Sequence, residues 1–155
     1  MPSPDPFERH DHGACRARAL AQAEATCEGS LTPVRRRVLE LLLESHVALG
    51  AYDVLQRLRE EGHAAQPPVA YRALDFLVGH GLVHRIERLN AFVACHRPDE
   101  CEAPAFLICR ACNRVAETAS APKRGALARD ARNLGFEIEE AVIEAQGLCP
   151  GCRAP

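Results

Sequence analysis

The sequence predicts a mixed α/β protein, in which a winged helix-turn-helix unit precedes a small α/β unit that carries two pairs of cysteines. Apolar residues recur at helical spacing as far as about residue 80, and they alternate with polar residues between 82 and 95. Two Cys-x-x-Cys pairs then lie in the last third of the chain. From these observations we expect a flexible tail at 1–14, a winged-helix unit at 15–95, a hinge loop at 96–104 and a second unit at 105–155.

The composition favours a protein with a thin core. Of the 155 residues, 47% are hydrophobic but only 5% are aromatic, so a structural metal would strengthen the fold. The formal net charge of −2 excludes a global positive field, and contact with nucleic acid needs a local patch. The first residues lack the apolar stretch of a signal peptide, and no run reaches the length of a membrane span. We therefore expect a cytoplasmic protein, where reduced thiols favour metal binding over disulfides.

Four helices are expected before residue 82. The first covers the alanine-rich residues 16–28. Thr32 and Pro33 suit the N-cap and first position of the second helix, while Gly50 separates it from a third that ends at Gly62. The residues expected to face the core are Val34, Val38, Leu41 and Leu42 in the second helix, Val54, Leu55 and Leu58 in the third, and Ala70, Ala73, Leu74, Leu77 and Val78 in a fourth at 67–80.

Strands follow the helices. Residues 82–87 and 91–95 predict a hairpin that turns at 88–90, and helices followed by a hairpin are the order of a winged helix-turn-helix. The second unit is expected to run strand, strand, helix, strand, at 106–108, 115–117, 123–134 and 136–143.

The two Cys-x-x-Cys pairs, Cys109 with Cys112 and Cys149 with Cys152, predict a structural zinc site. Two intervening residues let both sulfurs of a pair reach one ion, and two pairs supply the four thiolates of a closed tetrahedral shell. Because 36 residues separate the pairs, the second unit has to fold back to bring its two ends together. A redox motif or disulfides are the alternatives, but a redox motif requires only one such pair.

Several stretches together carry a family resemblance. They are Leu-Thr-Pro at 31–33 with the arginines at 35–37, Ala-Tyr-Asp-Val-Leu at 51–55, Tyr-Arg-Ala-Leu at 71–74 and the two cysteine pairs. In order and spacing they resemble the ferric uptake regulator family, and the resemblance covers residues 16–153. The stretches at 71–77 and 142–149 are similar to its zinc uptake regulator branch.

The resemblance implies a function for each unit. The winged helix would bind DNA, and residues 105–155 would form a dimerisation domain that holds the structural zinc. The whole would be a homodimeric repressor rather than an enzyme. It would bind palindromic operators of zinc-uptake genes when zinc is plentiful, without a small-molecule substrate.

The fourth helix should enter the major groove, with Tyr71 and Arg72 near its N-terminal end. Tyr71 can contact a thymine methyl or a phosphate, and Arg72 can form two hydrogen bonds with guanine. The residues assigned to DNA are Tyr71, Arg72, Arg35, Arg36 and Tyr52. A core tyrosine and solvated surface arginines are the alternatives. The sequence departs from the family at Ala70, where a Ser or Thr is usual, so the hydroxyl that could cap the helix or contact a phosphate is absent.

The resemblance places a second, regulatory zinc at the hinge, on His84, Cys95 and Glu117. Imidazole, thiolate and carboxylate together suit zinc, and the thiolate disfavours harder ions. As alternatives, His84 can be a half-buried sheet residue and Glu117 a surface charge. An ion that joined the wing, the hinge and the second unit would fix the angle between the two units.

The fourth regulatory ligand is left open by the sequence. Cys101 is the first choice because its thiolate is soft, Glu102 matches the family position best, and His96 adjoins Cys95. Cys95 and Cys101 can alternatively form a redox-sensitive thiol pair.

Three other functions are compatible with parts of the same pattern. An iron-, manganese- or peroxide-responsive member of the same family is disfavoured by Cys95 and by the lack of a His-x-His cluster before Cys109. A thiol redox protein and a zinc-stabilised protein-interaction module come from other classes. No nucleophile elbow, phosphate loop or His-Glu-x-x-His motif indicates an enzyme.

Overall fold

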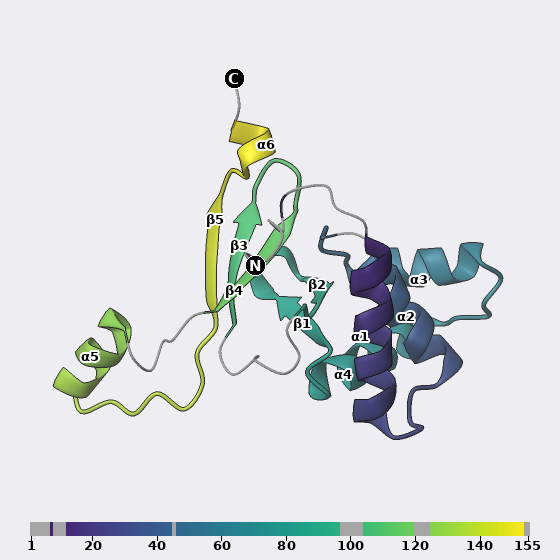
Figure 1. The fold of residues 1–155 in the computed structure, drawn as a ribbon, viewed down its shortest axis with the longest axis horizontal. Coiled ribbons are helices and arrows are strands. Elements are labelled where there is room, and N and C mark those ends of the chain that lie inside the picture. The colour runs from purple at the N-terminus through teal and green to yellow at the C-terminus, as the bar shows by residue number, and fades with distance from the viewer. Residues whose placement is uncertain (1–6, 8–11, 45, 97–103, 120–124, 154–155) are drawn as a thin grey trace.

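The structure is a computed structural model that describes residue 7 and residues 12–44, 46–96, 104–119 and 125–153. Figure 1 shows a group of helices at one side, a small wing beside it and a three-stranded sheet beyond the wing. The elements are α1 (His12–Cys27), α2 (Pro33–Leu43), α3 (Ala51–Glu60), α4 (Pro67–Gly79), β1 (Val83–Ile86), η1 (Glu87–Leu89), β2 (Ala91–Ala94), β3 (Pro104–Cys109), β4 (Val115–Ala119), α5 (Ala126–Asn133), β5 (Ile143–Gly147) and α6 (Pro150–Arg153).

Local residue chemistry fixes the helix ends. Thr32 Oγ1 accepts a hydrogen bond from Arg35 N at 3.4 Å, and Pro33 occupies the first turn of α2. At the start of α3, Gly50 N donates to the Asp53 carboxylate at 3.0 Å. After α3, Gly62 has a φ of 86°, a left-handed conformation that costs glycine little. The predicted starts of α2 and α4 and the predicted stop at Gly62 are confirmed.

Two sheets follow the helices, as predicted. β1 and β2 form the antiparallel wing, joined by a short 3-10 turn in which Asn90 is left-handed. The second sheet has the order β4-β3-β5, with β3 antiparallel to β4 and parallel to β5. The predicted order of strand, strand, helix, strand in the second unit is confirmed.

Two hydrophobic clusters support these layers. The larger one lies among α1 to α4 and the inner side of the wing. The smaller one joins Ile86 and Val93 of the wing to Phe106, Ile108 and Val115 of the second sheet. The second unit therefore shares its core with the wing, and this cluster crosses the predicted boundary between the units.

The structure corrects several expected boundaries. The first helix begins at His12, inside the predicted tail and four residues before the expected start, because adding a turn to an established helix costs little. The helix expected at 123–134 is described as Ala126–Asn133, and Lys123 lies outside the described residues. Val78 was expected to face the core, but its side chain is 37% exposed.

The last strand was predicted in the wrong place. Residues 136–142 alternate in polarity but form no strand, and β5 begins at Ile143. Phe136 is 65% exposed, because none of the elements described in the structure covers it. β5 itself contains Glu, Ala and Gly, which are poor strand formers, and its position is set by backbone pairing with β3. No helix in the described ranges is long and apolar enough to span a bilayer.

Candidate metal centres and DNA-binding surface

The four paired cysteines meet at one end of the second sheet. Cys109 ends β3, Cys112 lies in the turn after it, Cys149 follows β5 and Cys152 lies in α6. All four Sγ atoms lie within 4.8 Å of one another. Zinc–sulfur bonds of about 2.3 Å in a tetrahedron place neighbouring sulfurs about 3.8 Å apart. Because the Sγ atoms of Cys112 and Cys149 are 3.8 Å apart, the cluster could hold zinc.

The electrostatics of this cluster also favour a cation. The backbone N–H of Cys149 donates to Cys109 Sγ at 3.4 Å, and such backbone donors lower the pKa of the Cys109 thiol to about 6. Hydrogen bonds with Cys149 and the other cysteines raise the pKa of Cys152 to about 12. Four thiolates this close repel one another, so the fully deprotonated form requires a positive ion at the centre.

A second cluster joins the wing to the second sheet. His84 comes from β1, Cys95 directly follows β2, and Glu117 comes from β4. One ligand atom from each lies within 4.8 Å of the others. His84 Nε2 is 3.5 Å from Glu117 Oε1, and Cys95 Sγ donates to the same oxygen at 3.7 Å. The structure thus brings together the three residues that were expected to form the hinge site.

Strand register explains this convergence. The backbone N–H of Cys95 donates to Leu82 O at 2.9 Å, which continues the hairpin pairing of His84 with Val93. The ring of His84 packs against Phe106 of β3, with centroids 5.2 Å apart. Because Glu117 on β4 is the register partner of Phe106, the carboxylate reaches the imidazole from the neighbouring strand.

The charge state of His84 depends on these neighbours. Burial lowers its pKa, but hydrogen bonds and charge attraction from Cys95 and Glu117 outweigh burial and raise the pKa to about 9. A zinc ion bound here would replace the proton that the imidazole otherwise carries.

The proposed fourth ligands fall into two groups. Cys101 and Glu102 lie outside the described residues. The backbone N–H of His96 donates to Glu117 Oε2 at 3.2 Å, but its ring lies against His46. Among the described residues, the hinge cluster therefore comprises His84, Cys95 and Glu117, without His96.

The predicted DNA-reading residues lie on the surface of the helical unit. Tyr71 and Arg72 are exposed near the start of α4, and Tyr71 is 54% exposed rather than a core aromatic. Tyr52, in the first turn of α3, is 69% exposed. The opposite face of α4 packs into the core through Ala73, Leu74 and Leu77, which holds the exposed face in place.

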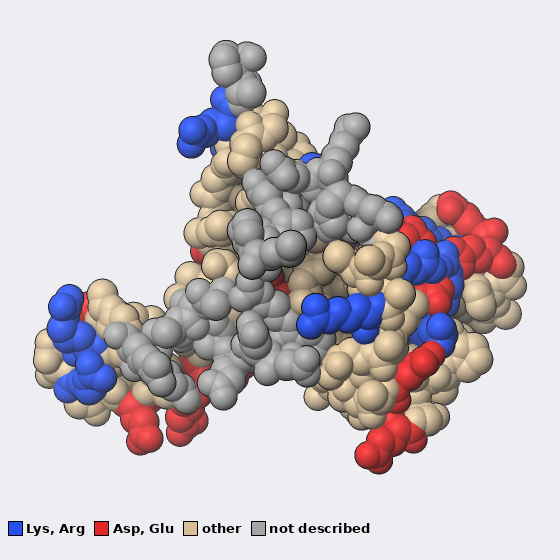
Figure 2. All heavy atoms as spheres, in the orientation of Figure 1, with Lys and Arg blue, Asp and Glu red and all other residues tan. Residues whose placement is uncertain are grey.

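Arg35 and Arg36 are already engaged within the chain. Arg35 donates to Ser30 O at 2.7 Å, and its guanidinium lies 3.8 Å from the centre of the Phe76 ring. Arg36 pairs with Glu24 and Glu40. Figure 2 shows basic and acidic side chains side by side over this unit. These contacts within the chain differ from the expected alternative of solvated surface arginines, and DNA contact by these two arginines stays a prediction.

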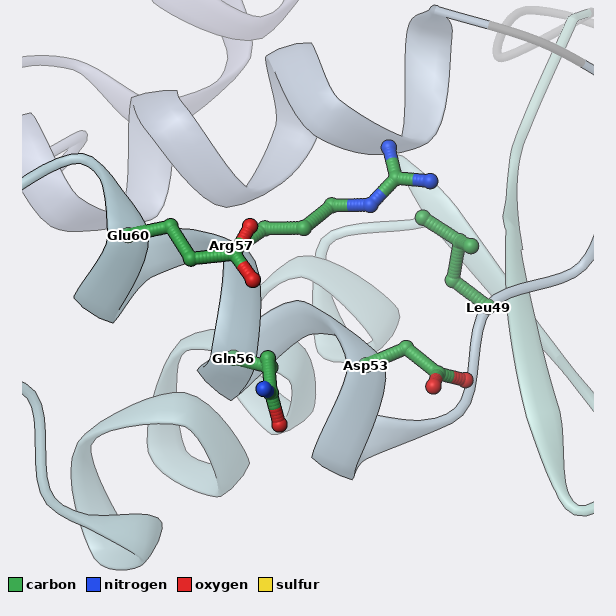
Figure 3. A pocket seen from close by; sticks show the side chains of 5 residues that line it. All are labelled: Leu49, Asp53, Gln56, Arg57 and Glu60. Carbon is green, nitrogen blue, oxygen red and sulfur yellow. The ribbon is translucent and has the colours of Figure 1, made fainter.

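A shallow hollow beside α3 contributes no ligands to either cluster. Figure 3 shows it lined by Leu49, Asp53, Gln56, Arg57 and Glu60. The guanidinium of Arg57 forms an ion pair with the carboxylate of Glu44, with an N–O distance of 3.4 Å. The carboxylate of Asp53 accepts a hydrogen bond from Gly50 N at the start of α3. The lining contains no cysteine or histidine, so we assign it no metal chemistry.

Two contacts near the hinge were not predicted from the sequence. The Glu144 carboxylate of β5 accepts hydrogen bonds from Glu87 N at 2.7 Å and Arg88 N at 3.0 Å, which ties the second sheet to the wing turn. His46, after α2, lies against His96. A single carboxylate or histidine gives no sequence signal for such a role, because its partner lies 50 or more residues away.

Comparison with known proteins agrees with this geometry. The profile described as the ferric uptake regulator family matches residues 29–146. The zinc uptake regulation protein of Escherichia coli is 42% identical over 137 residues, which cover 86% of this chain and 80% of that protein. A structure described as a zinc uptake regulator complexed with zinc and DNA is similar with a TM-score of 0.79 at 40% identity, covering 88% of this chain and 94% of the other.

A pair of solved structures bears on the arrangement of the units. Holo XcZur is similar with a TM-score of 0.74 at 38% identity, covering 86% of this chain and 95% of the other. Apo XcZur has a TM-score of 0.51 at 35% identity, covering 91% of this chain and 99% of the other. The described arrangement is thus nearer to that of the holo structure, in keeping with the convergence of ligand atoms in both clusters.

Proposed function

The chain belongs to the ferric uptake regulator family, and we propose that it is a zinc-dependent transcriptional repressor that binds palindromic operators of zinc-uptake genes as a homodimer. Its role is regulatory rather than catalytic, and its site of action is the cytoplasm. Zinc serves both as a structural ion and as the corepressor. The resemblance to a zinc uptake regulator bound to zinc and DNA over most of the chain supports this function.

The structural ion belongs to Cys109, Cys112, Cys149 and Cys152. Their sulfurs converge from the end of β3 and from the segment after β5, so that one ion there would hold the two ends of the second unit together. The second unit shares its hydrophobic core with the wing, so a zinc crosslink within the unit would add to its stability.

The regulatory ion belongs to His84, Cys95 and Glu117, with Cys101 as the proposed fourth ligand and Glu102 as its alternative. This cluster is the main structural support for a zinc-dependent repressor, because its three residues come from both sides of the hinge: from β1, from the end of β2 and from β4. Ligand atoms from both units can bind one zinc ion together only when the units have one relative orientation. Because zinc binds this orientation more tightly than others, zinc binding favours it.

The orientation matters because a dimer presents two copies of α4. Tyr71 and Arg72 lie exposed near the start of that helix, where a recognition helix contacts bases, and Tyr52 lies exposed on α3. Two half-sites of a palindrome lie about 34–36 Å apart, one turn of DNA. Arg35 and Arg36 would have to exchange their present partners to contact phosphate, so we give them a secondary role.

The decisive experiment measures binding to a palindromic operator across buffered free zinc, with the four-cysteine site kept loaded. Wild type should bind only above a zinc threshold. His84→Ala should raise that threshold by about 10- to 100-fold or more, since it removes a direct ligand. His63→Ala, a histidine between α3 and α4 and outside both clusters, should behave as wild type. Operator binding that ignores zinc in a folded protein would contradict the proposal.

The same titration with iron(II) and manganese(II) addresses the rival metals. The Cys95 thiolate at the hinge favours zinc over these harder ions. The redox alternative has less support, because the sulfurs of one cysteine pair face those of the other and form a single cluster.

A further inference from the structure

A pair of histidines lies next to the hinge cluster but outside it. His46 follows α2, and His96 directly follows Cys95. His46 Nδ1 and His96 Nε2 are 3.1 Å apart, and the ring centroids are 4.6 Å apart. Neither ring belongs to the group formed by His84, Cys95 and Glu117.

The backbone holds both rings in place. His46 is buried, and its carbonyl oxygen accepts a hydrogen bond from Val115 N at 2.9 Å. The backbone N–H of His96 donates to the Glu117 carboxylate at 3.2 Å. The pair is therefore anchored to β4 from two directions, which limits the entropy lost when both rings bind one ion.

The separation of the two nitrogens suits a shared metal ion. Two imidazole nitrogens bound to one tetrahedral zinc at about 2.0–2.1 Å lie about 3.3 Å apart. The distance of 3.1 Å between His46 Nδ1 and His96 Nε2 is close to this value, so small ring movements are sufficient for chelation. Both nitrogens are common metal-binding atoms of histidine.

We propose that His46 and His96 form a further binding site for a divalent transition metal, separate from the four-cysteine cluster and from the hinge cluster. Imidazole ligands without thiolate suit zinc, copper(II) and nickel(II). When the ion binds, the N–H proton between the two rings is given up to solvent and the ring that carried it is protonated at its other nitrogen, so that both imidazoles stay neutral. Because two neutral imidazoles supply no charge, the site fills after both thiolate sites. An ion there joins the end of α2 to the residue after the wing.

Zinc stoichiometry tests this site without reference to DNA. The full-length protein is dialysed against buffered zinc up to concentrations at which both thiolate sites are full, and bound zinc is counted by mass spectrometry of the metal. His46→Asn should bind one ion fewer per chain than wild type, and His46→Ala should give the same result. His80→Ala, a histidine on the far end of α4 held by Phe76, should keep the full number. Circular dichroism confirms that each variant is folded.

Double variants decide whether the site is separate. His46→Asn with His96→Ala should lose no more zinc than either change alone, whereas His46→Asn with Cys95→Ser should lose two ions. Cobalt substitution gives an independent readout: the His46 variant should retain the thiolate-to-cobalt absorption of the hinge site. A folded His46→Asn that binds as much zinc as wild type overturns the proposal. Loss of a single shared ion in the His46 and Cys95 variants also overturns it, because His46 would then serve the hinge site.

Discussion

Arg72 illustrates how one exposed side chain can carry sequence recognition. It lies near the start of α4, while the next turn of that helix is locked into the core by Leu74 and Leu77. A guanidinium on such a fixed base can form two hydrogen bonds with one guanine. The packed face of α4 therefore fixes the backbone from which the exposed Arg72 side chain extends.

We predict that Arg72→Ala weakens operator binding by about 1–3 kcal/mol, or roughly 5- to 150-fold, with little change for non-operator DNA. Fluorescence anisotropy at saturating zinc measures both affinities at fixed salt. Arg18→Ala removes an exposed arginine from α1, outside the predicted DNA-reading residues, and should leave the operator affinity unchanged. Equal losses on operator and random DNA would instead assign Arg72 to phosphate contact.

Residue types with a specific chemistry were predictable from the sequence, and residues whose role depends on tertiary contact were not. Cys109, Cys112, Cys149 and Cys152 stand out through their spacing alone. His84, Cys95 and Glu117 stand out only through the family resemblance, and the structure then brings their ligand atoms within 4.8 Å. His46 and Glu144 have no local signal, since the partner of each lies 50 or more residues away in the sequence.

At the scale of elements, one arginine links α2 to the end of α3. Arg37 binds Glu61 through two hydrogen bonds, from Nε at 2.7 Å and from a terminal nitrogen at 2.5 Å, and it also pairs with Glu40 and Glu44. Paired geometry of this kind is stronger than an isolated surface ion pair. We predict that Arg37→Ala lowers the free energy of unfolding by about 1 kcal/mol, measured by urea denaturation at pH 7.

The same contact predicts a pH dependence. The hydrogen bond from Arg37 lowers the pKa of Glu61 below its ordinary 4.5. A carboxyl whose pKa is lower when folded stabilises the protein above the unfolded value and loses that contribution as pH falls through the folded value. The difference in unfolding free energy between wild type and Arg37→Ala should therefore be constant above about pH 5 and shrink below pH 4.5. Acid release of zinc affects both proteins alike, and a difference that grew on acidification would contradict this origin.

Glu144 is the contact through which β5 positions the wing. Its carboxylate accepts the backbone N–H groups of Glu87 and Arg88 at the start of the wing turn. We predict that Glu144→Ala leaves zinc stoichiometry unchanged but weakens zinc-dependent operator binding by several-fold, since losing hydrogen bonds to a charged, partly exposed acceptor costs about 1 kcal/mol. Hydrogen exchange at the amides of Glu87 and Arg88 should accelerate. Glu137→Ala, an exposed carboxylate before β5, provides the control.

The strand at 143–147 shows the limit of periodicity as a guide. The apolar Phe136 and Ile138 alternate with glutamates, which is the pattern of a strand with one covered face. In the described chain, that stretch has no sheet to join, while β5 forms by pairing with β3 despite an unfavourable composition. The helices α2 to α4 were predictable because their caps and apolar stripes agree with the tertiary packing.

At the scale of the whole molecule, the two units share a hydrophobic core, and both units contribute residues to the hinge cluster of candidate zinc ligands. Ile86 and Val93 of the wing pack against Phe106, Ile108 and Val115 of the second sheet. The hinge cluster lies in the same region, where His84 packs on Phe106. A change in hinge geometry therefore has to repack this cluster, which favours two discrete arrangements over a continuous range.

The low net charge of the DNA-binding unit determines how much of the DNA affinity has to come from dimerisation. Residues 30–90 contain eight basic and seven acidic residues, so the DNA-binding unit has a local net charge of only +1. Several of these arginines are committed to ion pairs inside the chain. Attraction to phosphate is thus modest, and binding depends on two recognition helices that engage one palindrome together.

The surface that would join two protomers follows from the exposed apolar residues of the second unit. Figure 1 shows α5, on the connection from β4 to β5, well away from the second sheet. Apolar side chains remain exposed along α5 and the segment after it, namely Leu127, Leu134, Phe136 and Val142, with Leu134 at 84%. A patch of this kind is typical of an interaction site. Because family members act as dimers and the second unit exposes this apolar patch, we assign the dimer interface to it.

Phe136→Glu tests this assignment. A stable interface buries about 800 Å² per partner, and a charge placed at its apolar centre would lose its hydration there, so the dimer should dissociate at micromolar concentration. Light scattering after size exclusion measures the mass, with Glu137→Gln as the neighbouring control that should remain dimeric. Operator affinity should fall at least tenfold because the two recognition helices no longer bind as one unit. The four-cysteine site should stay loaded, which separates loss of the dimer from loss of the fold. A Phe136→Glu protein that stayed dimeric and bound its operator normally would place the interface on another face of the second unit.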